Sequence, residues 1–272
     1  MLTHKKIAFI GAGTMAESIV AGLLKEGLVD PNQIWVTNYS KRARLQKINE
    51  RYRVNITYDL RELLPDADIV ILAMKPKDVT WALEEIQPFT NSDQLFLSLV
   101  AGASTTHISK QLKHKAPIIR VSPNTPSAIG ESATGLTPGT YATNKDLNIA
   151  LILFDAIGLA VSVPEKEIDA VTALSGSAPA YIFYLIEALE KAGEEVGLEQ
   201  ELSKKLILQT LYGAALLIKN SSEETCTLYE QVMSPQGVTA AGFEVLKQYR
   251  FQESIIEAIK QGTKRSKELG EM

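Results

Sequence analysis

The sequence predicts an α/β fold: an N-terminal doubly wound sheet, followed by an all-α C-terminal dimerisation domain. Short β-rich runs alternate with helical stretches through the first part of the chain, and a glycine-rich turn follows the first run. From about Glu165 onward no convincing strand pattern is present. Alternating strands and helices are typical of a parallel sheet with helices on both faces. We therefore expect one domain at residues 1–163 and a second at residues 164–272.

The elements of the first domain follow from apolar runs and from helical spacing. Continuous apolar runs are typical of strands buried on both faces of a sheet. Apolar residues at helical spacing, such as Ile19, Leu23 and Leu24, indicate helices. The expected strands are Ile7–Ile10, Ile34–Thr37, Ile69–Met74, Leu95–Val100 and Ile118–Val121, and the expected helices include Met15–Glu26 and Lys41–Arg51.

The second domain is predicted to be wholly helical. Its helical patterns are Ala180–Val196, Glu199–Lys219, Gln236–Gln248 and Gln252–Leu269. The first pattern opens Ala-Tyr-Ile-Phe-Tyr-Leu-Ile and is apolar on most faces. Helices of this kind need burial on most sides, which favours a partner subunit over a compact monomeric bundle. We expect a homodimer through this domain, and a higher oligomer stays open.

Composition and charge exclude several classes of function. The 272 residues carry a net charge of −4 without a long Lys/Arg block, which argues against nucleic-acid binding. The apolar runs fall far short of the ~20 residues needed to cross a bilayer, and the N-terminal run is too short for a secretory signal. The single cysteine excludes an internal disulfide. We expect a cytoplasmic protein that binds neither nucleic acid nor membranes.

A dinucleotide site is predicted directly after the first strand. Gly11-Ala12-Gly13-Thr14-Met15-Ala16 links that strand to a helix. Gly11 permits a tight turn, Gly13 lets the backbone approach a pyrophosphate, and the small Ala16 lets the helix lie close to the strand. The helix N-terminus then offers N–H groups to the phosphates. This context indicates a Rossmann-type domain, with residues 11–15 as candidate cofactor ligands.

The end of the second strand bears on the choice between NAD and NADP. NAD sites place Asp or Glu there, to bind the ribose 2′-hydroxyl. Here the segment reads Val-Thr-Asn38-Tyr-Ser40-Lys41-Arg42, without an acid. Asn38, Ser40 and Lys41 could meet a 2′-phosphate, as could Arg42; alternatively, Lys41 and Arg42 only open a solvated helix. We expect NADPH as the cofactor, with NADH less favoured.

Two further loops at strand ends are candidate cofactor contacts, because ligands of open α/β sheets lie at the carboxyl ends of the strands. Ala73-Met74-Lys75-Pro76 lies at the end of the expected strand Ile69–Met74, and Ala101-Gly102 follows the expected strand Leu95–Val100. Lys75 either faces the nicotinamide half of the cofactor or starts a surface helix. The sequence does not separate these two interpretations.

Three more motifs follow one another along the chain: Ser122-Pro-Asn124-Thr-Pro, Ser175-Gly-Ser177-Ala178-Pro-Ala-Tyr, and Ser234-Pro-Gln236-Gly237-Val238-Thr239. In this order and spacing they resemble the motifs of the pyrroline-5-carboxylate reductase family, and the resemblance covers essentially the whole chain. It implies a Rossmann domain and a helical domain that interlocks with its twin in a dimer. It also implies reduction of Δ1-pyrroline-5-carboxylate to L-proline with NAD(P)H, the last step of proline biosynthesis.

Two positions depart from the family's usual pattern. Ala178 stands where the family usually has glycine, and its extra methyl group should be tolerated if its φ is negative. Gln236 also replaces a usual glycine, in a loop that would hold the substrate carboxylate. This larger change keeps open an NADP-dependent imine reductase with a different substrate range.

The last motif has the character of an anion site at a helix start. Ser234 is a good N-cap and proline suits the first helical position. The N–H groups of Gly237, Val238 and Thr239 would then be free to bind a carboxylate. The resemblance implies that Thr239 hydrogen-bonds the substrate's ring nitrogen and assists its protonation, so Thr239 is the candidate catalytic residue. The alternative for Thr239 is a local helix-start hydroxyl.

The candidate substrate contacts are Ser234, Gly237, Val238, Ser175, Ser177 and Asn124. Ser175 and Ser177 could equally be plain N-caps. No metal is expected, because the three histidines fall outside every motif and are expected at the surface.

Two rival functions remain. A β-hydroxyacid dehydrogenase would carry a catalytic lysine on the helix after the mid-chain glycine motif, but the first lysine after Gly176 is Lys191. From a different class, a catalytically inactive NADP-binding regulatory paralogue is possible. The presence of Ser234, Gly237 and Thr239 argues against it.

Overall fold

The computed structural model describes residue 2 and residues 4–271. Contacts divide the chain into two compact units, which we describe separately: residues 1–179 together with 260–272, and residues 180–259. Both breaks fall within long helices, α8 (Ala178–Glu195) and α12 (Phe251–Glu271). The domain boundary expected at residues 163 and 164 stays a prediction.

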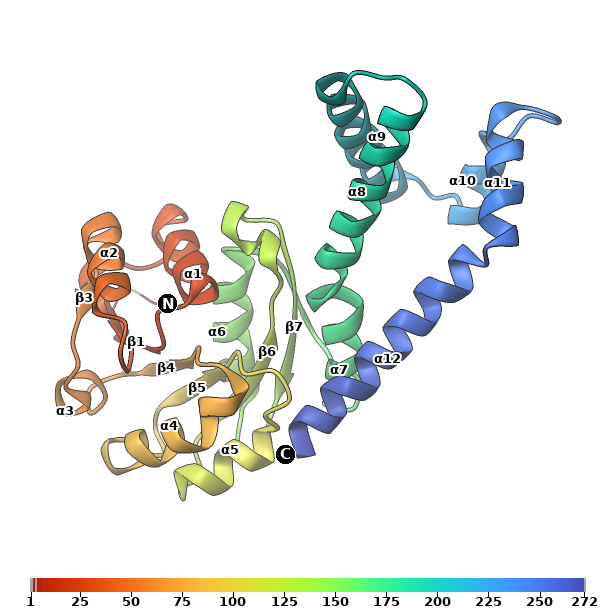
Figure 1. The fold of residues 1–272 in the computed structure, drawn as a ribbon. Helices are drawn as coiled ribbons and strands as arrows, with labels where there is room; N and C mark the ends of the chain where they lie inside the picture. Colours follow the sequence, from red (N-terminus) through yellow and green to blue (C-terminus); the bar gives the residue numbers. More distant parts are fainter. Residues whose placement is uncertain (1, 3, 272) are drawn as a thin grey trace. The chain divides into compact units, whose positions relative to one another are not determined.

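The larger unit is built on an eight-stranded sheet in the order β3-β2-β1-β4-β5-β6-β7-β8 (Figure 1). β7 pairs antiparallel with β6, and all other neighbouring strands are parallel. Because β1 lies between β2 and β4, the strand order reverses at β1, which is where open α/β sheets bind ligands. The strands are β1 (Ile7–Ile10), β2 (Ile34–Thr37), β3 (Asn55–Ile56), β4 (Ile69–Leu72), β5 (Leu95–Ser98), β6 (Ile118–Ser122), β7 (Ser132–Pro138) and β8 (Gly158–Ser162).

All five expected strands are present, although β4 and β5 each end two residues earlier than expected. β3, β7 and β8 were not expected. β7 reads Ser-Ala-Thr-Gly-Leu-Thr-Pro, without an apolar run, and it is a strand because β6 and β8 pair with both of its edges. The sheet is therefore mixed and mostly parallel.

Helices cover both faces of this sheet (Figure 1). One face carries α1 (Thr14–Lys25), α2 (Arg42–Tyr52) and α6 (Asn144–Asp155), and the other carries α3 (Leu60–Leu63), α4 (Val79–Ile86) and α5 (Thr105–Leu112).

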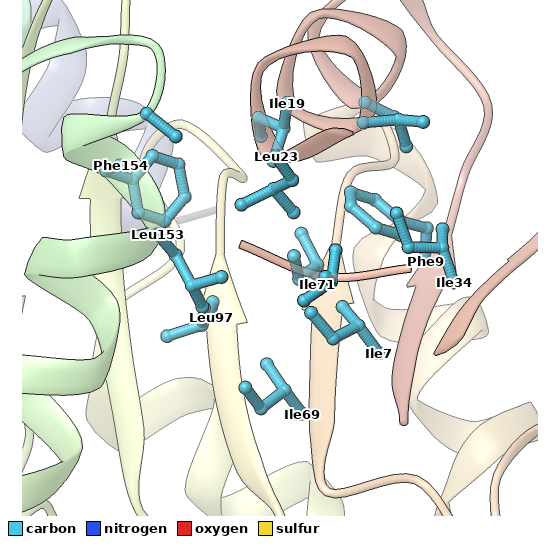
Figure 2. Packing of buried hydrophobic residues seen from close by; sticks show 14 of the residues in the cluster. Ile7, Phe9, Ile19, Leu23, Ile34, Ile69, Ile71, Leu97, Leu153 and Phe154 are labelled. Carbon is cyan, nitrogen blue, oxygen red and sulfur yellow. The ribbon is translucent and has the colours of Figure 1, made fainter. Parts of the chain in front are cut away.

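Alternate residues of each central strand face the two helical layers, as the two-residue period of a strand requires. In β1, Ile7 and Phe9 belong to the cluster that contains Leu23 and Phe154 (Figure 2). Ala8 and Ile10 belong to the opposite cluster, with Leu83. Burial on both faces explains why these strands are continuous apolar runs.

A continuous helical stretch ends the main body of this unit. It comprises α7 (Ile168–Val171), a π-helical turn (Thr172–Gly176) and the start of α8. The N–H of Ser177 donates to the oxygen of Thr172 at 2.9 Å, and the hydroxyl of Ser175 donates to the oxygen of Val171 at 3.0 Å. Ser177 has φ −90° and ψ −24°, whereas an N-cap is usually extended. The interpretation of Ser175 and Ser177 as N-caps is therefore wrong.

The smaller unit is wholly helical, as expected. It contains α9 (Gln200–Asn220), α10 (Thr225–Gln231), α11 (Val238–Gln248) and parts of α8 and α12. α8 and α9 pack closely, since a Cβ on Gly193 would lie 2.5 Å from the Ser203 hydroxyl oxygen. Among the described residues, no helix is both long and apolar enough to cross a membrane.

The apolar side chains of the smaller unit are largely exposed. Within residues 180–259, all of which the structure describes, only Gly193 and Ser203 are buried. Large side chains such as Tyr184 (75% exposed), Tyr212 (62%) and Leu217 (60%) face outward. A single copy of this unit does not bury a core of its own, so the compact monomeric bundle is wrong for this unit.

Candidate cofactor and substrate sites

The glycine turn lies where three strand ends meet. The N–H of Gly11 donates to the oxygen of Thr37, at the end of β2, at 2.9 Å. On the other side the N–H of Ala73, after β4, donates to the oxygen of Ile10 at 2.9 Å. Gly11 has φ 121°, and a Cβ there would lie 2.5 Å from the oxygen of Ala73. Both the backbone conformation and the close approach require glycine.

The start of α1 fits a pyrophosphate group. Gly13 is the N-cap, with φ −74° and no side chain that could cap the helix. A Cβ on Gly13 would meet nothing within 4 Å, so the backbone is open on this side. The first N–H groups of a helix have no intrahelical acceptor and carry partial positive charge. Thr14 and Met15 begin the helix, and the small Ala16 in its first turn is buried.

An arginine that the motifs did not single out supports this turn. Arg44, on α2, donates from Nε to the oxygen of Ala12 at 2.9 Å and pairs with Glu17 on α1. Glu17 also accepts from Arg51 at 3.2 Å and from the hydroxyl of Tyr52 at 3.3 Å. Burial, followed by the charge of Glu17, raises the pKa of Tyr52, which keeps its hydroxyl a donor. No sequence spacing signals this network, because it joins two different helices.

The link between β2 and α2 is shaped by Asn38. Its Oδ1 accepts from the N–H of Lys41 at 2.9 Å, and its Nδ2 donates to the oxygen of Lys41 at 3.0 Å. Lys41 is the N-cap of α2 and is exposed, as is Ser40. The arrangement fits both interpretations of this link, a 2′-phosphate site and a solvated helix start.

The loops after β4 and β5 differ in what they contact. In Ala73-Met74-Lys75-Pro76, Lys75 is exposed and precedes a short 3-10 helix (Pro76–Asp78), so both of its interpretations stay open. Ala101 is exposed, whereas Gly102 is buried with φ 80°. A Cβ on Gly102 would lie 2.7 Å from the carbonyl carbon of Leu269, near the end of α12. Gly102 is therefore required for packing, independently of any cofactor contact.

Asn124 connects the loop after β6 to two other segments. The side chain is buried, and its Oδ1 accepts from the N–H of Ala133 at 3.0 Å and from the hydroxyl of Ser132 at 3.1 Å. Its Nδ2 donates to the backbone oxygen of Ser175 at 3.1 Å. The structure thus brings together two predicted substrate contacts, Asn124 and Ser175.

In the smaller unit, Ser234–Gly237 forms a tight turn before α11. The N–H of Gly237 donates to the oxygen of Ser234 at 2.9 Å, and Gln236 has φ 59°. Proline in the second position and a left-handed third residue are features of a type II turn. Helix α11 then begins at Val238 with Gly237 as its N-cap.

The prediction that Ser234 caps this helix is wrong. Left-handed Gln236 cannot belong to a right-handed helix, so the helix starts two residues later than expected. A Cβ on Gly237 would displace the hydroxyl of Ser234 and would lie 3.0 Å from its backbone oxygen, a tight contact that favours glycine at this position. Ala178, in contrast, lies in the right-handed helix α8, and its φ is not positive, as tolerance of its methyl group requires.

The start of α11 keeps the features of an anion site, but the N–H of Gly237, which was expected to be free, is bonded to the oxygen of Ser234. Its N-cap Gly237 has no side chain to cap the helix, and Val238 is 94% exposed. The Thr239 side chain is half-buried, and its hydroxyl has no hydrogen-bond partner in the part of the chain that the structure describes. A free hydroxyl beside unpaired helix N–H groups can bind a carboxylate and one further polar atom.

Of the histidines, His4 is exposed, whereas His107 and His114 are half-buried and do not match the expected surface position. His114 has the more extensive contacts of the two. It is half-buried, its Nε2 lies 3.0 Å from the hydroxyl of Thr90, and its ring centroid lies 6.1 Å from that of Phe96. Apart from the masked residues, no group of three or more His, Cys, Asp or Glu side chains could hold a metal ion.

Two family models match the sequence. Residues 6–102 match the model described as "NADP oxidoreductase coenzyme F420-dependent", and residues 165–269 match the model for pyrroline-5-carboxylate reductase dimerisation. The chain therefore combines an NADP-binding domain with a dimerisation domain and forms homo-oligomers. The second match covers the helices whose apolar side chains are exposed in a single copy.

Full-length relatives agree with these models. Pyrroline-5-carboxylate reductase 2 of Bacillus subtilis is 43% identical over 98% of this chain and 96% of its own length. The solved pyrroline-5-carboxylate reductase of Coxiella burnetii superposes with a TM-score of 0.88 at 38% identity, covering 97% of this chain and 98% of that one. The Plasmodium falciparum pyrroline carboxylate reductase, solved with NADP bound, gives 0.90 at 28% identity, covering 98% of both chains. The chain belongs to the pyrroline-5-carboxylate reductase family.

Proposed function

We propose that this protein reduces the C=N bond of Δ1-pyrroline-5-carboxylate with NADPH and releases L-proline, the last step of proline biosynthesis. The observation that carries the proposal is the start of α11. There an uncapped helix N-terminus and the unpaired Thr239 hydroxyl occur in a family member that matches the reductases over nearly its whole length. A substrate with one carboxylate and one C=N group needs these two features.

The proposed cofactor contacts follow the carboxyl edge of the sheet. The backbone around Gly11 and Gly13 offers N–H groups to the pyrophosphate, and the acid-free link after β2 suits a 2′-phosphate. Bound NADPH supplies the hydride, and the protein contributes orientation and electrostatics. The full proposed set is Gly11, Ala12, Gly13, Thr14, Met15, Asn38, Ser40, Lys41, Ala73, Met74, Lys75, Pro76, Ala101 and Gly102.

The proposed substrate contacts have distinct roles. The turn from Ser234 to Val238 holds the carboxylate, chiefly through the backbone N–H groups of Val238 and Thr239, because the N–H of Gly237 already donates to the oxygen of Ser234. The hydroxyl of Thr239 hydrogen-bonds the ring nitrogen and assists its protonation, which makes the imine carbon more electrophilic. Asn124, Ser175 and Ser177 are proposed as further contacts. Asn124 has one amide N–H beyond those in its protein hydrogen bonds, whereas the hydroxyl of Ser175 is already donated to Val171.

We propose a homodimer through the helical domain, with a higher oligomer open, and a cytoplasmic location. The exposed apolar side chains of α8 and α9 support the dimer. Sedimentation tests it: a folded monomer at micromolar concentration would contradict it. Cell fractionation tests the location.

The direct test is NADPH oxidation on adding pyrroline-5-carboxylate, with proline identified as the product. Tight NADPH binding without turnover would support the inactive regulatory paralogue instead. Because Gln236 departs from the family pattern, 1-pyrroline, which lacks the carboxylate, is the matched second substrate. A kcat/KM for 1-pyrroline that equals or exceeds that for pyrroline-5-carboxylate would favour a broader imine reductase.

A further inference from the structure

We propose that Thr172 is a positioning residue of the substrate site and acts through Asn124. The inference rests on the proposed reaction, in which Asn124 is a substrate contact. Thr172 begins the π-helical turn, and the same turn carries Ser175, whose backbone oxygen accepts from the amide of Asn124 at 3.1 Å. The placement of this turn therefore decides where the amide of Asn124 is held.

Three side chains from β6 and the loop after it bind the helical stretch at regular intervals. They are two residues apart along the chain, as on one side of an extended segment. Their partners are three residues apart, close to the spacing of neighbours on one helix face. We call these contacts the polar seam: Arg120 with Asp169, Ser122 with Thr172, and Asn124 with Ser175.

The first contact of the polar seam fixes α7 against β6. The Arg120 guanidinium lies 2.7 Å from the Asp169 carboxylate, and their side chains are only 7% and 16% exposed. The same carboxylate oxygen accepts from the hydroxyl of Ser266, on α12, at 2.7 Å. Breaking a buried ion pair leaves an uncompensated charge, so this contact strongly favours one position of α7. Thr172 follows Asp169 by about one helical turn.

The middle contact has a defined direction. The hydroxyl of Thr172 has a single proton, which it donates to the backbone oxygen of Ile168 at 2.8 Å. The hydroxyl of Ser122 lies 2.8 Å from that of Thr172, so Ser122 is the donor and Thr172 the acceptor. Both side chains are half-buried. This bond holds the start of the π-helical turn on the last residue of β6.

The last contact passes this placement on to Asn124. In an α-helix the oxygen of Ser175 would accept from the N–H of residue 179, but Pro179 has no N–H. The amide of Asn124 donates to this oxygen instead. Because the amide group is planar, holding one of its N–H groups on Ser175 fixes the direction of the other. That other N–H is the one that the proposed reaction offers to the substrate.

Thr172→Val removes the hydroxyl and keeps the β-branched shape. We expect the KM for pyrroline-5-carboxylate to rise about fivefold, within the range for one hydrogen bond, with kcat and the KM for NADPH unchanged. Thr172→Ser keeps the acceptor and should restore the KM. Ser122→Ala should raise the KM to the same extent, and the double variant no further, because both substitutions remove one shared bond.

Thr90→Val is the matched control. Thr90 is also half-buried, its hydroxyl donates to the backbone oxygen of Gln87 at 3.0 Å, and it contacts a second side chain, His114, at 3.0 Å. Thr90→Val should lower the Tm about as much as Thr172→Val does, and should leave the KM for the substrate unchanged. A lower Tm with a wild-type KM in Thr172→Val would make Thr172 a structural residue only and overturn the proposal.

A double variant tests whether Thr172 acts through Asn124. When Thr172→Val is added to Asn124→Ala, the KM for the substrate should stay at the value of Asn124→Ala alone. A further fivefold rise would show independent effects, and Thr172 would then not act through Asn124.

A spectroscopic measurement separates this inference from the proposed reaction. In protein made with isotope-labelled asparagine, the side-chain amide NMR signal that is absent from Asn124→Ala belongs to Asn124. We expect this signal to shift in Thr172→Val and not in Thr90→Val. If it shifts but the wild type does not reduce pyrroline-5-carboxylate, the proposed reaction alone is wrong. If it does not shift, the positioning role is wrong, whether or not the wild type reduces the substrate.

Discussion

The side-chain amide of Asn124 donates a hydrogen bond of 3.1 Å to the backbone oxygen of Ser175, which ties the loop after β6 to the π-helical turn before α8. Asn124→Ala removes this bond and leaves the N–H of Ala133 without its acceptor. An unsatisfied polar group costs about 1–3 kcal/mol, so we expect a Tm lower by roughly 5 °C. Thermal unfolding at fixed protein concentration measures this change.

Asn148→Ala is the matched control, since Asn148 is exposed on α6 and should leave the Tm nearly unchanged. A wild-type Tm in Asn124→Ala, accompanied by a higher KM for the substrate, would show that Asn124 acts on the substrate instead.

Features encoded within a few consecutive residues could be predicted from the sequence. The turn at Gly11 and Gly13 is such a feature, because a tight turn and an open backbone need particular residues at particular positions. β7 is not, because its seven residues become a strand only through pairing with β6 and β8. The contact of Gly102 with Leu269 and the hydrogen bond from Arg44 to Ala12 could not be predicted either, because each joins distant parts of the chain.

The helix start at Thr239 shows a different limit. Ser234 and Pro235 favour a cap and a first helical residue, and the prediction followed those local preferences. In the structure the left-handed Gln236 delays the helix to Val238. Glutamine seldom adopts this conformation, so its identity gave no sign of the turn.

The stability of the larger unit should depend on pH through His114. Burial lowers the pKa of its imidazole, so in the folded state it resists protonation. As the pH falls below about 6.5, the unfolded chain binds this proton more readily, and the free energy of unfolding decreases. The stabilisation is fully present above the unfolded pKa and is lost on acidification.

We therefore expect the Tm of His114→Gln to fall less than that of the wild type between pH 7 and pH 5.5. His4→Gln, at an exposed position, serves as the control. An identical pH dependence in His114→Gln and the wild type would exclude His114 as the source.

Gln236→Gly tests whether the departure from the family pattern alters activity. The backbone at Gln236 already has φ 59°, which glycine adopts freely, and the side chain is exposed. We expect kcat/KM for pyrroline-5-carboxylate to stay within about threefold of the wild type, a difference below 1 kcal/mol. Gln236→Val, a β-branched residue at positive φ, should lower the Tm. A change in kcat/KM of tenfold or more in the glycine variant would make Gln236 a determinant of substrate range.

Cofactor preference should depend on the acid-free link after β2. We expect the wild type to have a higher kcat/KM with NADPH than with NADH. Lys41→Glu places a negative charge where the 2′-phosphate is proposed, and should lower kcat/KM for NADPH about tenfold, the equivalent of about 1.4 kcal/mol. The value for NADH should not fall. Lys47→Glu, an exposed lysine farther along α2, controls for the change in net charge. Equal losses with both cofactors would exclude a 2′-phosphate contact at Lys41.

The role of Thr239 can be separated from the shape of its side chain. Thr239→Val keeps the β-branched shape and removes the hydroxyl, which has no hydrogen-bond partner among the described residues and so contributes little to folding. We expect kcat to fall by about one to two orders of magnitude, as for loss of a proton donor, with the Tm and the KM for NADPH unchanged. Thr239→Ser keeps a hydroxyl and should retain most of the activity. A wild-type kcat in Thr239→Val would remove Thr239 from the proton transfer. The backbone N–H groups at the start of α11 would then be the remaining donors in that segment.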